Sequence, residues 1–323
     1  MVRKTDYAPR IEAIGSGITR PLWSVMIPTF NCARYLTQTL ESVLDQDPGP
    51  DNMQIEVVDD CSSLDDPEHV VSAVGLGRVD FFRQRANVGA TANFNTCIER
   101  SRGHIVHILH GDDYVLPGFY DRMSLGLRGR ETGAAFCAHL YVDESEKRIH
   151  QTAIHRSDPG FLDDALPLLA LSQKIQFAAM VVRRECYERL GGFNSTLRHA
   201  ADWEMWVRVA ANYSIWFEPA LLAAYRIHRE SDTSRLVLSG ANVRDVRHAE
   251  RFIRETVPRE LRSRVSAEVL LKYGLDAGET ARRLLREGHF GGALCQAWQS
   301  FRCLSNPNLL SKTAVRLVKK YFG

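Results

Sequence analysis

Short apolar segments alternate with amphipathic ones through the first half of the chain, and this alternation restricts the fold more than any other feature. We expect strands at 23–27, 55–58, 79–83, 104–109 and 134–141, and helices after residue 31 and near 67–74, 90–100 and 117–127. Strands and helices that repeat every ~20–30 residues are typical of an α/β domain with a mostly parallel sheet. Such sheets bind ligands beyond the carboxyl ends of their strands, so the residues after each strand are the first candidates for a site.

The pattern changes after residue 141. In the next part we expect a strand at 175–183, a helix that opens at Asp202, and short strands at 215–217 and 221–225. From 238 onward the pattern is helical. We therefore divide the chain into a lead-in at 1–20, an α/β domain at 21–236 and a basic helical C-terminal region at 237–323.

The charge divides at the same place. The 323 residues include 41 Lys+Arg and 39 Asp+Glu, which gives a formal net charge of +2. Residues 237–323 contain 16 Lys+Arg and 8 Asp+Glu, a net +8, so residues 1–236 carry −6. Hydrophobic residues at 45% and charged residues at 25% exclude collagen-like, low-complexity and wholly disordered chains. The acidic front part and the basic end suggest two different tasks.

We expect no disulfide framework, zinc cluster or membrane span. The seven cysteines are scattered and form no C-x-x-C pair, which favours a reducing compartment. The N-terminal residues lack the apolar core of a signal peptide, and no stretch approaches ~18 uncharged apolar residues. The expected location is the cytoplasm, and the basic end leaves open a peripheral contact with the inner face of the membrane.

Two pairs of adjacent aspartates follow expected strands. Asp112 and Asp113 follow the fourth strand, where paired carboxylates can bind Mg²⁺ or Mn²⁺, and such a cation would neutralise a diphosphate. Asp59 and Asp60 follow the second strand, where a carboxylate can accept an imide N–H or a hydroxyl group of a nucleoside. In both places the alternative is a solvated turn at the end of a strand.

Two further segments have both a functional and a structural interpretation. Residues 28–31 expose backbone groups and the Phe30 ring to a ligand, or they form a β–α turn in which Asn31 caps the next helix. Residues 87–89 form a tight loop beside phosphates, or an ordinary helix start.

Several residues with suitable chemistry are not assigned to a site. His104, His107 and His110 alternate along an expected strand, and we assign none of them to a metal because a hydrophobic strand is a poor metal cage. Trp203 and Trp206 lie three residues apart on a helix and are expected to pack in the core rather than to stack on a sugar.

Seven short motifs occur in a fixed order along the chain. They lie at 28–31, 59–60, 87–89, 112–113, 191–193, 202–206 and 225–228. Their order and spacing resemble the family 2 glycosyltransferases over about residues 21–234. The resemblance implies a GT-A fold with a nucleotide-binding part at 21–141 and an acceptor-side part at 142–236. It also implies an inverting transfer of sugar from a nucleoside-diphosphate sugar.

The resemblance assigns nucleotide binding to residues that follow four of the strands. These residues are Pro28, Thr29, Phe30, Asp59, Asp60, Asn87, Gly89 and Asp112. Thr29 and Phe30 would line the nucleoside pocket, and Asp60 would meet the base with support from Asp59. Asp112 would lie near the ribose or the metal.

The resemblance also assigns the metal and the catalytic base. Asp113 would be the main ligand of a divalent metal, Mn²⁺ or Mg²⁺, and His228 would reach the metal or the diphosphate. Asp202 would be the catalytic base, because an inverting transfer is one displacement in which the acceptor hydroxyl loses its proton as it attacks. The structural alternative for Asp202 is a helix cap, which is compatible with catalysis.

The sequence departs from the family pattern in two places. Cys61 stands where glycine is frequent, and Ala201 stands where an acidic residue is frequent. The Gln-x-x-Arg-Trp signature of processive synthases is absent, so we expect transfer of a single sugar. The expected acceptor is a glycan or a lipid-linked precursor, as in bacterial-type surface polysaccharide or glycolipid synthesis.

Two other functions remain as alternatives. A non-catalytic nucleotide-sugar-binding or scaffold protein could retain the GT-A fold, although the intact Asp60, Asp113, Asp202 and His228 argue against it. A nucleotidyltransferase would need a Gly-rich basic phosphate loop near the first strand, where only Arg34 is found. No motif indicates nucleic acid as a partner.

Residues 308–322 have apolar side chains on one helical face and basic side chains on the other. Such a helix can lie on an anionic membrane surface. The alternative is that it packs on its own domain or on a second copy of the chain in a homo-oligomer.

Overall fold

A computed structural model describes residues 7–305, and the chain separates into two compact units. The sheet unit comprises the chain up to Asp163, Lys174–Thr196 and Asn212–Ile227. The helical unit comprises Asp164–Gln173, Leu197–Ala211 and the chain from His228 onward. The domain boundaries expected at 20, 141 and 236 stay predictions.

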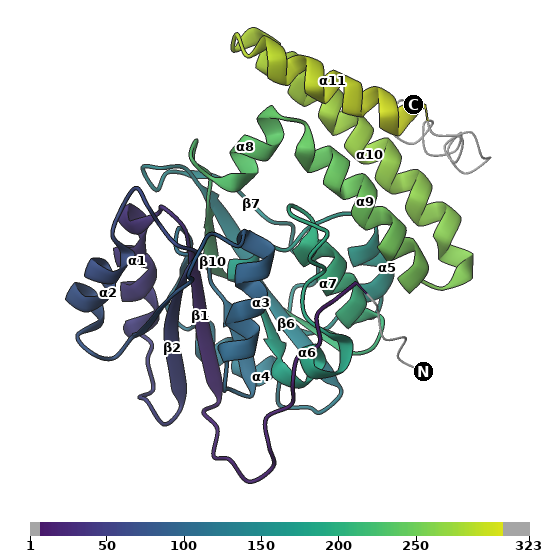
Figure 1. Cartoon of the computed structure of the whole chain (residues 1–323). Coiled ribbons are helices and arrows are strands. Elements are labelled where there is room, and N and C mark those ends of the chain that lie inside the picture. The colour runs from purple at the N-terminus through teal and green to yellow at the C-terminus, as the bar shows by residue number, and fades with distance from the viewer. Residues whose placement is uncertain (1–6, 306–323) are drawn as a thin grey trace. The chain divides into compact units, whose positions relative to one another are not determined.

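Within the described residues, the sheet unit is built on one ten-stranded mixed sheet flanked by helices (Figure 1). The strand order is β3-β2-β1-β4-β9-β6-β10-β5, with β7 paired to β6 and β8 paired to β10. The strands are β1 (Trp23–Thr29), β2 (Met53–Asp59), β3 (Asp80–Arg83), β4 (Ile105–Ile108), β5 (Tyr114–Val115), β6 (Thr132–Val142), β7 (Arg148–Gln151), β8 (Gly160–Phe161), β9 (Met180–Arg183) and β10 (Ser214–Arg226). The helices are α1 (Ala33–Leu44), α2 (Pro67–Gly75), α3 (Ala90–Arg100), α4 (Phe119–Gly126), the 3₁₀ turn η1 (Phe177–Ala179) and α6 (Arg184–Leu190). The α/β fold expected from the sequence is confirmed.

The first four strands are parallel, and a helix follows each of the first three. β1 lies between β2 and β4, and all seven residues of β1 and of β2 are buried. Strands that are covered on both faces are mostly apolar, which is why the sequence identified them, although β2 also buries Gln54 and Glu56. Parallel strands end at the same edge of a sheet, so the segments after β1, β2 and β4 are brought to one edge.

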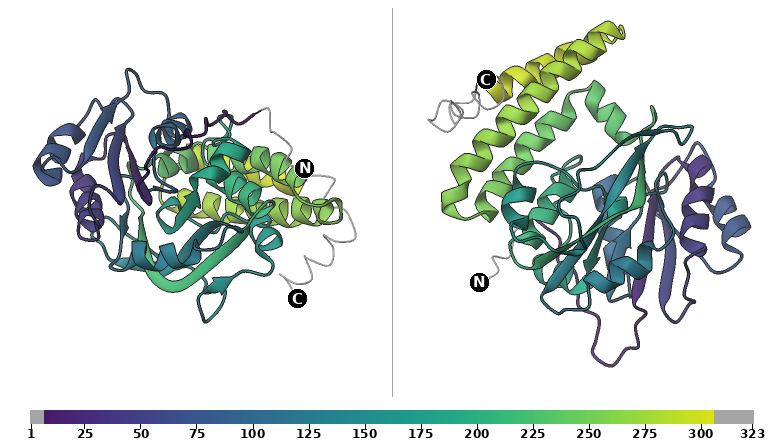
Figure 2. Two further views of the ribbon diagram at one scale, coloured as in Figure 1. Left: turned by 90° about the horizontal axis from the view of Figure 1, so that it is seen from below. Right: turned by 180° about the vertical axis from the view of Figure 1, so that it is seen from behind.

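β10 is one long strand, whereas the sequence predicted two short ones. It pairs in parallel with β6, and the register shifts between Glu218 and Leu221 and again before Ala223. Pro219 lies inside the first shift, where its missing N–H costs no ladder hydrogen bond. Such irregularities bend a strand, and β10 curves along its length in the left view of Figure 2. The predicted break is therefore a bulge.

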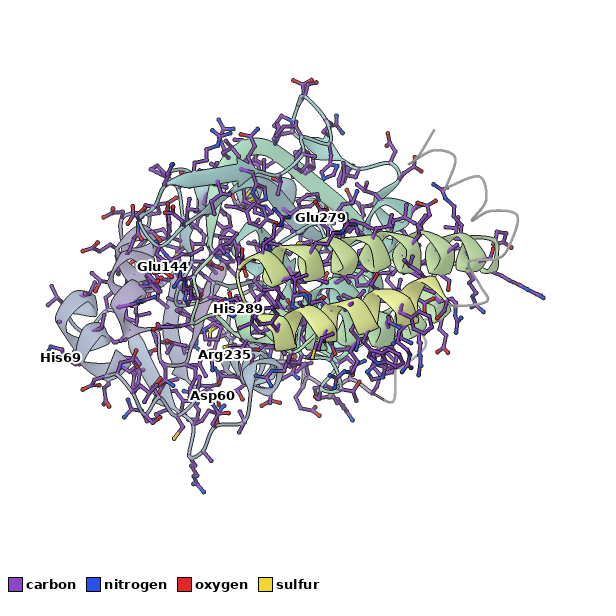
Figure 3. The ribbon with its side chains drawn as sticks, turned by 90° about the horizontal axis from the view of Figure 1, so that it is seen from above. Asp60, His69, Glu144, Arg235, Glu279 and His289 are labelled. Atoms are coloured by element: carbon purple, nitrogen blue, oxygen red, sulfur yellow. The ribbon has the colours of Figure 1, made fainter. Side chains whose placement is uncertain are left out.

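The helical unit has a core of its own. Its helices are α5 (Ala165–Ala170), α7 (Ala201–Ala210), α8 (Asp232–Leu238), α9 (Ala241–Thr256), α10 (Arg259–Arg286) and α11 (Phe290–Leu304). Figure 3 shows α10 and α11 side by side, with Glu279 on α10 and His289 just before α11. Residues from α9, α10 and α11 form one buried cluster, which consists of Val243, Ala267, Leu270, Leu271, Ala277 and Cys303. The helical C-terminal region expected from the sequence is confirmed.

The start of α1 differs from the expectation. Cys32 occupies the cap position and makes no side-chain capping bond, so Asn31 does not cap the helix. Asn31 has φ +51°, and its Oδ1 accepts hydrogen bonds from the backbone N–H groups of Ser63 and Leu64 at 2.9 and 3.0 Å. A contact with a distant loop has replaced the local cap.

The start of α7 also differs by one position. Ala200 is the cap residue and Asp202 lies within the first turn, so the helix-cap interpretation of Asp202 is wrong. Trp203 and Trp206 are buried, as expected for core residues.

The described part of the chain includes no helix that is both long and apolar enough to span a bilayer. The amphipathic segment predicted at 308–322 lies outside the described residues.

Glu204 and Arg208 form a buried ion pair on α7. Arg208 Nε and Nη2 donate to the two Glu204 oxygens at 3.0 and 2.9 Å, and the side chains are 4% and 1% exposed for Arg208 and Glu204. We predict that Arg208→Met lowers the free energy of unfolding by about 3–5 kcal/mol, because Glu204 keeps a buried charge that has lost this partner. The double variant Glu204→Leu/Arg208→Met should recover most of that loss. Urea unfolding of the three chains measures the difference, and equal losses in both variants would contradict the prediction.

Candidate active site

The segments after β1, β2 and β4 are joined by backbone hydrogen bonds. Asp60 N donates to Thr29 O at 2.9 Å, and Gly111 N donates to Pro28 O at 3.0 Å. A Cβ atom at Gly111 would lie 3.1 Å from both Thr29 Oγ1 and Cys32 Sγ, so only glycine allows this approach without displacement. Thr29 Oγ1 itself lies 2.9 Å from Cys32 Sγ. The predicted nucleotide-binding and metal-binding segments therefore meet at one edge of the sheet.

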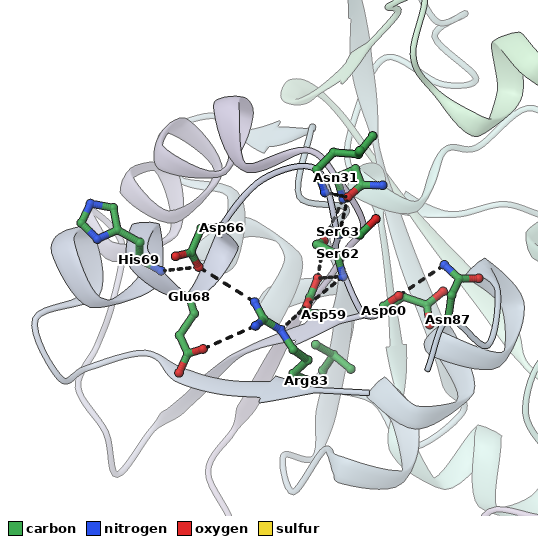
Figure 4. A network of polar contacts seen from close by, with 12 residues as sticks. Asn31, Asp59, Asp60, Ser62, Ser63, Asp66, Glu68, His69, Arg83 and Asn87 are labelled. Carbon is green, nitrogen blue, oxygen red and sulfur yellow. Dashed lines mark hydrogen bonds and ion pairs between the residues drawn. The ribbon is translucent and has the colours of Figure 1, made fainter. Parts of the chain in front are cut away.

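Asp59 is fully buried and organises the loop between β2 and α2 (Figure 4). Its carboxylate accepts hydrogen bonds from Ser62 N at 3.1 Å, from Ser62 Oγ and from Arg83 Nε at 2.8 Å. The Arg83 guanidinium also lies 3.9 Å from the Asp66 carboxylate and 3.8 Å from that of Glu68. Asp59 thus has its charge compensated inside the protein.

Asp60 closes the neighbouring loop at 87–89. Its Oδ1 accepts from Val88 N at 2.7 Å, its Oδ2 accepts from Gly89 N at 2.9 Å, and Asn87 Nδ2 donates to its carbonyl oxygen at 3.3 Å. Burial raises the pKa of Asp60, while the two backbone N–H groups act to lower it. The structure therefore brings three predicted nucleotide-binding residues, Asp60, Asn87 and Gly89, within hydrogen-bond distance.

Cys61 has φ +62°, in the left-handed region of backbone space. Glycine adopts this conformation freely, whereas a residue with a Cβ atom pays roughly 1–2 kcal/mol. This strain is the physical reason why glycine is expected at this position, and Cys61 departs from that expectation.

His110, Asp112 and Asp113 form a cluster in which one ligand atom from each residue lies within 4.8 Å of the others. Asp113 is 1% exposed, and its Oδ1 accepts from Arg226 N at 2.9 Å. Asp113 Oδ2 and His110 Nε2 are buried with no hydrogen-bond partner among the described residues. Burial, and then the charge of Asp112, raise the pKa of the Asp113 carboxyl well above its ordinary value.

His110 lies beside the acidic pair, whereas sequence reasoning placed it in a strand and left it out of the metal site. β4 ends at Ile108, so His110 belongs to the loop of the acidic pair, where its ring stacks on Phe94 with centroids 5.0 Å apart. His107 lies inside the strand, where its Nε2 is 3.2 Å from Ala178 O and burial lowers its pKa to about 3. His107 is therefore a core residue.

These donors fit a divalent metal. Carboxylate oxygens suit Mg²⁺ and Mn²⁺, and an imidazole nitrogen suits transition metals such as Mn²⁺. Two unpartnered ligand atoms, Asp113 Oδ2 and His110 Nε2, are available beside the Asp112 carboxylate. A cation there would neutralise two adjacent carboxylates.

Arg226 holds the acidic loop against the end of β10. Besides its backbone bond to Asp113, its Nε donates to Asp112 O at 3.0 Å and its Nη2 donates to Gln38 Oε1. Its guanidinium lies 4.7 Å from the centre of the Tyr35 ring, and the residue is 2% exposed. The only sequence signal for this residue is its place in the motif at 225–228.

Asp202 lies in the helical unit and is 3% exposed. Gln173 Nε2 donates to its two oxygens at 2.9 and 2.8 Å, and Trp203 N donates to Oδ1 at 2.7 Å. Burial raises the pKa of Asp202 to about 7, against the lowering effect of the bonds from Gln173 and Trp203; the charge of Asp245 also raises it. A carboxyl group with a pKa near 7 can take up and release a proton at neutral pH, as a general base must.

Two residues that sequence reasoning missed fix this part of the helical unit. Asp245 Oδ2 on α9 accepts the N–H groups of residues 198, 199 and 200 at 3.0, 2.7 and 2.8 Å, directly before α7 begins. Tyr273 Oη on α10 accepts from Gln173 N at 3.0 Å. No local pattern could indicate either contact, because the partners are 45 to 100 positions apart.

His228 belongs to the helical unit, whereas the cluster of His110, Asp112 and Asp113 belongs to the sheet unit. His228 is buried, and its carbonyl oxygen accepts from Ser234 Oγ at 2.8 Å. Its expected role toward a metal or a diphosphate stays a prediction.

The match with a family model identifies the chain. The model for glycosyl transferase family 2 matches residues 24–191, slightly more than half of the 323 residues. The chain belongs to this family. The resemblance seen in the sequence motifs is confirmed, and the protein is a glycosyltransferase with a nucleotide-sugar-binding fold.

Relatives in several bacteria cover a similar part of the chain. An uncharacterised protein of Mycobacterium tuberculosis is 27% identical over 237 residues, which cover 70% of this chain and 73% of the relative. An uncharacterised glycosyltransferase of Rickettsia typhi is 22% identical over 219 residues, 66% of each chain. The putative colanic acid biosynthesis glycosyl transferase WcaA of Escherichia coli is 25% identical over 202 residues, 60% of this chain and 67% of WcaA.

Solved structures show the same fold. TarS of S. aureus in complex with UDP-GlcNAc has a TM-score of 0.65 at 16% identity, over 93% of this chain and 89% of TarS. The mannosyltransferase PcManGT of Pyrobaculum calidifontis in complex with GDP-Man and Mn²⁺ has a TM-score of 0.56 at 17% identity, over 98% of this chain and 84% of that one. These likenesses support the GT-A fold.

Asp202→Asn should change how stability depends on pH. The pKa of Asp202 rises from about 3.9 in the unfolded chain to about 7 in the folded protein, so the folded state binds this proton more tightly. The resulting stabilisation is complete below about pH 4 and is lost as the pH rises to about 7. Relative to Asp202→Asn, the free energy of unfolding of the wild type should fall by on the order of 4 kcal/mol across that range and then stay level.

Gln173→Leu tests the effect of the hydrogen bonds from Gln173 to the Asp202 carboxylate on the same dependence of stability on pH. Without this donor the pKa of Asp202 should rise further, so the fall in stability should extend above pH 7. Urea unfolding at a series of pH values measures both effects, and Asp158→Asn, at an exposed position in the sheet unit, is the control. A difference between wild type and Asp202→Asn that does not change with pH would contradict the raised pKa.

Proposed function

We propose that this family 2 glycosyltransferase moves one sugar from a nucleoside-diphosphate sugar to an acceptor hydroxyl, with inversion at the anomeric carbon and with a divalent metal. The observation that carries the proposal is Asp202, a buried carboxyl group held by Gln173 with a pKa of about 7. An inverting transfer needs one positioned base, and this group meets that requirement.

In the proposed step, Asp202 accepts the proton of the acceptor hydroxyl as that oxygen attacks the anomeric carbon. The bond between the anomeric carbon and the diphosphate oxygen breaks, and the nucleoside diphosphate leaves with the electron pair. Gln173 Nε2 donates to both carboxylate oxygens and so fixes the orientation of the base. One displacement inverts the configuration, and it needs no second nucleophile.

The nucleotide is assigned to the edge of the sheet where β1, β2 and β4 end. Asp60 would accept from the base, and Asp59 supports its loop through the ion pair with Arg83. The remaining assigned residues line the same edge or the loop at 87–89; they are Pro28, Thr29, Phe30, Asn87, Gly89 and Asp112.

The metal is assigned to Asp113, with Asp112 and His110 as further candidates in the sheet unit and His228 in the helical unit. A bound Mn²⁺ or Mg²⁺ would supply positive charge to the diphosphate, which becomes more negative as it leaves. Arg226 contributes by holding the acidic loop in place.

The proposed acceptor is a glycan or a lipid-linked precursor, as used in bacterial-type surface polysaccharide or glycolipid synthesis. A relative named for colanic acid biosynthesis supports this assignment. A scaffold protein that retains the fold is the competing function; it would bind nucleotide sugar and would not need a base with the environment of Asp202.

Asp202→Asn should abolish sugar transfer while it leaves nucleotide binding intact. We expect kcat to fall by at least about 10²–10⁴-fold, because the amide cannot accept the proton of the attacking hydroxyl. Release of nucleoside diphosphate measures turnover, and isothermal titration with nucleoside diphosphate measures binding. Asp158→Asn is the matched control. Unchanged turnover in Asp202→Asn would rule out the base, and a product that keeps the donor configuration by NMR would rule out inversion.

Nucleoside diphosphates should raise the melting temperature more in the presence of Mn²⁺ than in its absence. Asp113→Asn should remove the metal-dependent part of this shift, because the variant loses one carboxylate of the cluster. A thermal-shift screen of UDP, GDP and other nucleoside diphosphates with Mn²⁺ or with EDTA measures both parts, with Asp158→Asn as the control. A wild type with no metal-dependent shift for any nucleotide would contradict the metal assignment.

A further inference from the structure

α11 exposes the face that carries its large apolar residues and buries the face that carries small and polar residues. Its large apolar residues recur every three or four positions and so form one stripe, the α11 stripe, which consists of Phe290, Leu294, Trp298, Phe301 and Leu304. Leu294 is 74% exposed and Trp298 is 53% exposed. A helix of a soluble protein normally turns such a stripe toward the core, so this arrangement points to a partner.

The buried face of α11 packs tightly on α10 through small and polar side chains. Cys303 is buried, and Ser300 Oγ donates to Gly274 O at 2.7 Å. A Cβ atom at Gly274 would lie 2.9 Å from Cys303 Cβ and 2.8 Å from the Leu304 side chain, so the close approach of the two helices requires glycine there. This packing determines which face of α11 is covered, and it leaves the α11 stripe on the other face except for Leu304, which also contacts Gly274.

A pocket lined with arginines adjoins the stripe. It has a volume of about 290 Å³ and lies between α9 and α11, with Arg244 and Arg247 from α9 and Trp298, Gln299 and Arg302 from α11. Trp298 belongs to both the pocket and the stripe, so the two features form one continuous surface.

The arginines of the pocket form few contacts with the acidic side chains that the structure describes. Among the described residues, no ion pair involves Arg244, Arg247 or Arg302. Burial lowers the pKa of Arg247, and the neighbouring charges of Arg302 and Arg251 lower it as well, whereas those of Cys303 and Glu250 act to raise it. The nearby Glu250 lies 4.0 Å from Arg254. Guanidinium groups gathered in this way are complementary to an anionic phosphate group.

We propose that the α11 stripe and the arginine pocket dock the protein on an anionic phospholipid surface. In the proposed complex the stripe lies among the acyl chains near the headgroups, with its Trp and Phe rings at the interface, and the pocket binds a lipid phosphate. The proposal goes beyond sugar transfer and does not depend on the assignment of the catalytic base.

Charge complementarity favours this occupant over two others. A second copy of the chain in a two-fold dimer would place the same arginines opposite each other. Residues 308–322 contain four basic residues and no acidic one, so they offer nothing that would neutralise the pocket. Of these three occupants, an anionic surface is the one that would both cover the stripe and neutralise the arginines.

Binding of the full chain to vesicles tests the proposal. Vesicles of phosphatidylglycerol and phosphatidylcholine in equal parts should bind the wild type at low salt, and vesicles of phosphatidylcholine alone should bind it at least about tenfold more weakly. Arg244→Gln/Arg302→Gln and, separately, Leu294→Ser/Phe301→Ser should each lower the partition coefficient on the anionic vesicles by at least about tenfold. Sedimentation with the vesicles measures the bound fraction.

Matched controls change the same kinds of residue elsewhere. Arg128→Gln/Arg130→Gln and Leu125→Ser/Ile149→Ser alter exposed arginines and exposed apolar residues of the sheet unit and should leave binding unchanged. Circular dichroism checks that every variant is folded.

Three outcomes would overturn the proposal. The first is a wild type that binds neither kind of vesicle. The second is loss of binding in Lys319→Gln/Lys320→Gln with none in the α11 variants, which would assign the contact to the C-terminal residues. The third is a wild-type dimer by light scattering that Leu294→Ser/Phe301→Ser converts to a monomer, which would assign the stripe to a second copy.

Discussion

The parallel pairing of β1 with β2 on one side and β4 on the other is the constraint on which the site of the sheet unit depends. It aligns Thr29 with Asp59 in register and joins the loop after β4 to Pro28 through a backbone bond. Backbone hydrogen bonds therefore place both acidic pairs at one edge before any side chain contributes. Gly111 allows the closest of these approaches. In an α/β sheet of this kind the backbone pairing fixes the positions of the loops at the strand ends, and the side chains of these loops then determine which ligand can bind.

The buried carboxylates differ in how their charge is compensated, and this difference separates support from chemistry. Asp59 has an ion pair with Arg83, and Asp60 has two backbone donors. Asp113 keeps one oxygen without a partner among the described residues. Asp202 is held by neutral donors alone, so burial raises its pKa toward neutrality. Asp113 and Asp202, whose charges have no cationic partner of this kind in the described part of the chain, are the carboxylates assigned to metal binding and to proton transfer.

The helical unit carries the positive charge that the overall balance of +2 conceals. Residues 237–323 have a net charge of +8, and part of it gathers in the pocket between α9 and α11 beside an exposed apolar stripe. Tight packing of α11 on α10 uses small residues and so turns the large apolar ones outward. The acidic part of the chain supplies the transferase fold, and the basic part supplies the proposed membrane contact.

Local periodicity and motif order were enough to predict most strands and helices of the sheet unit, the acidic pairs after β2 and β4, and the family. Prediction from the sequence erred where a distant contact overrode a local rule: Asn31 binds the loop at 63–64 instead of capping α1, and a bulge joins two predicted strands into β10. The end of β4 at Ile108 puts the His110 ring in the loop of the acidic pair, and packing within the helical unit puts Gln173 against Asp202. The partners Gln173 and Asp202 lie 29 positions apart, and Arg226 and Asp113 lie 113 apart. Contacts between residues so far apart depend on how the elements pack, and they produce no local pattern in the sequence.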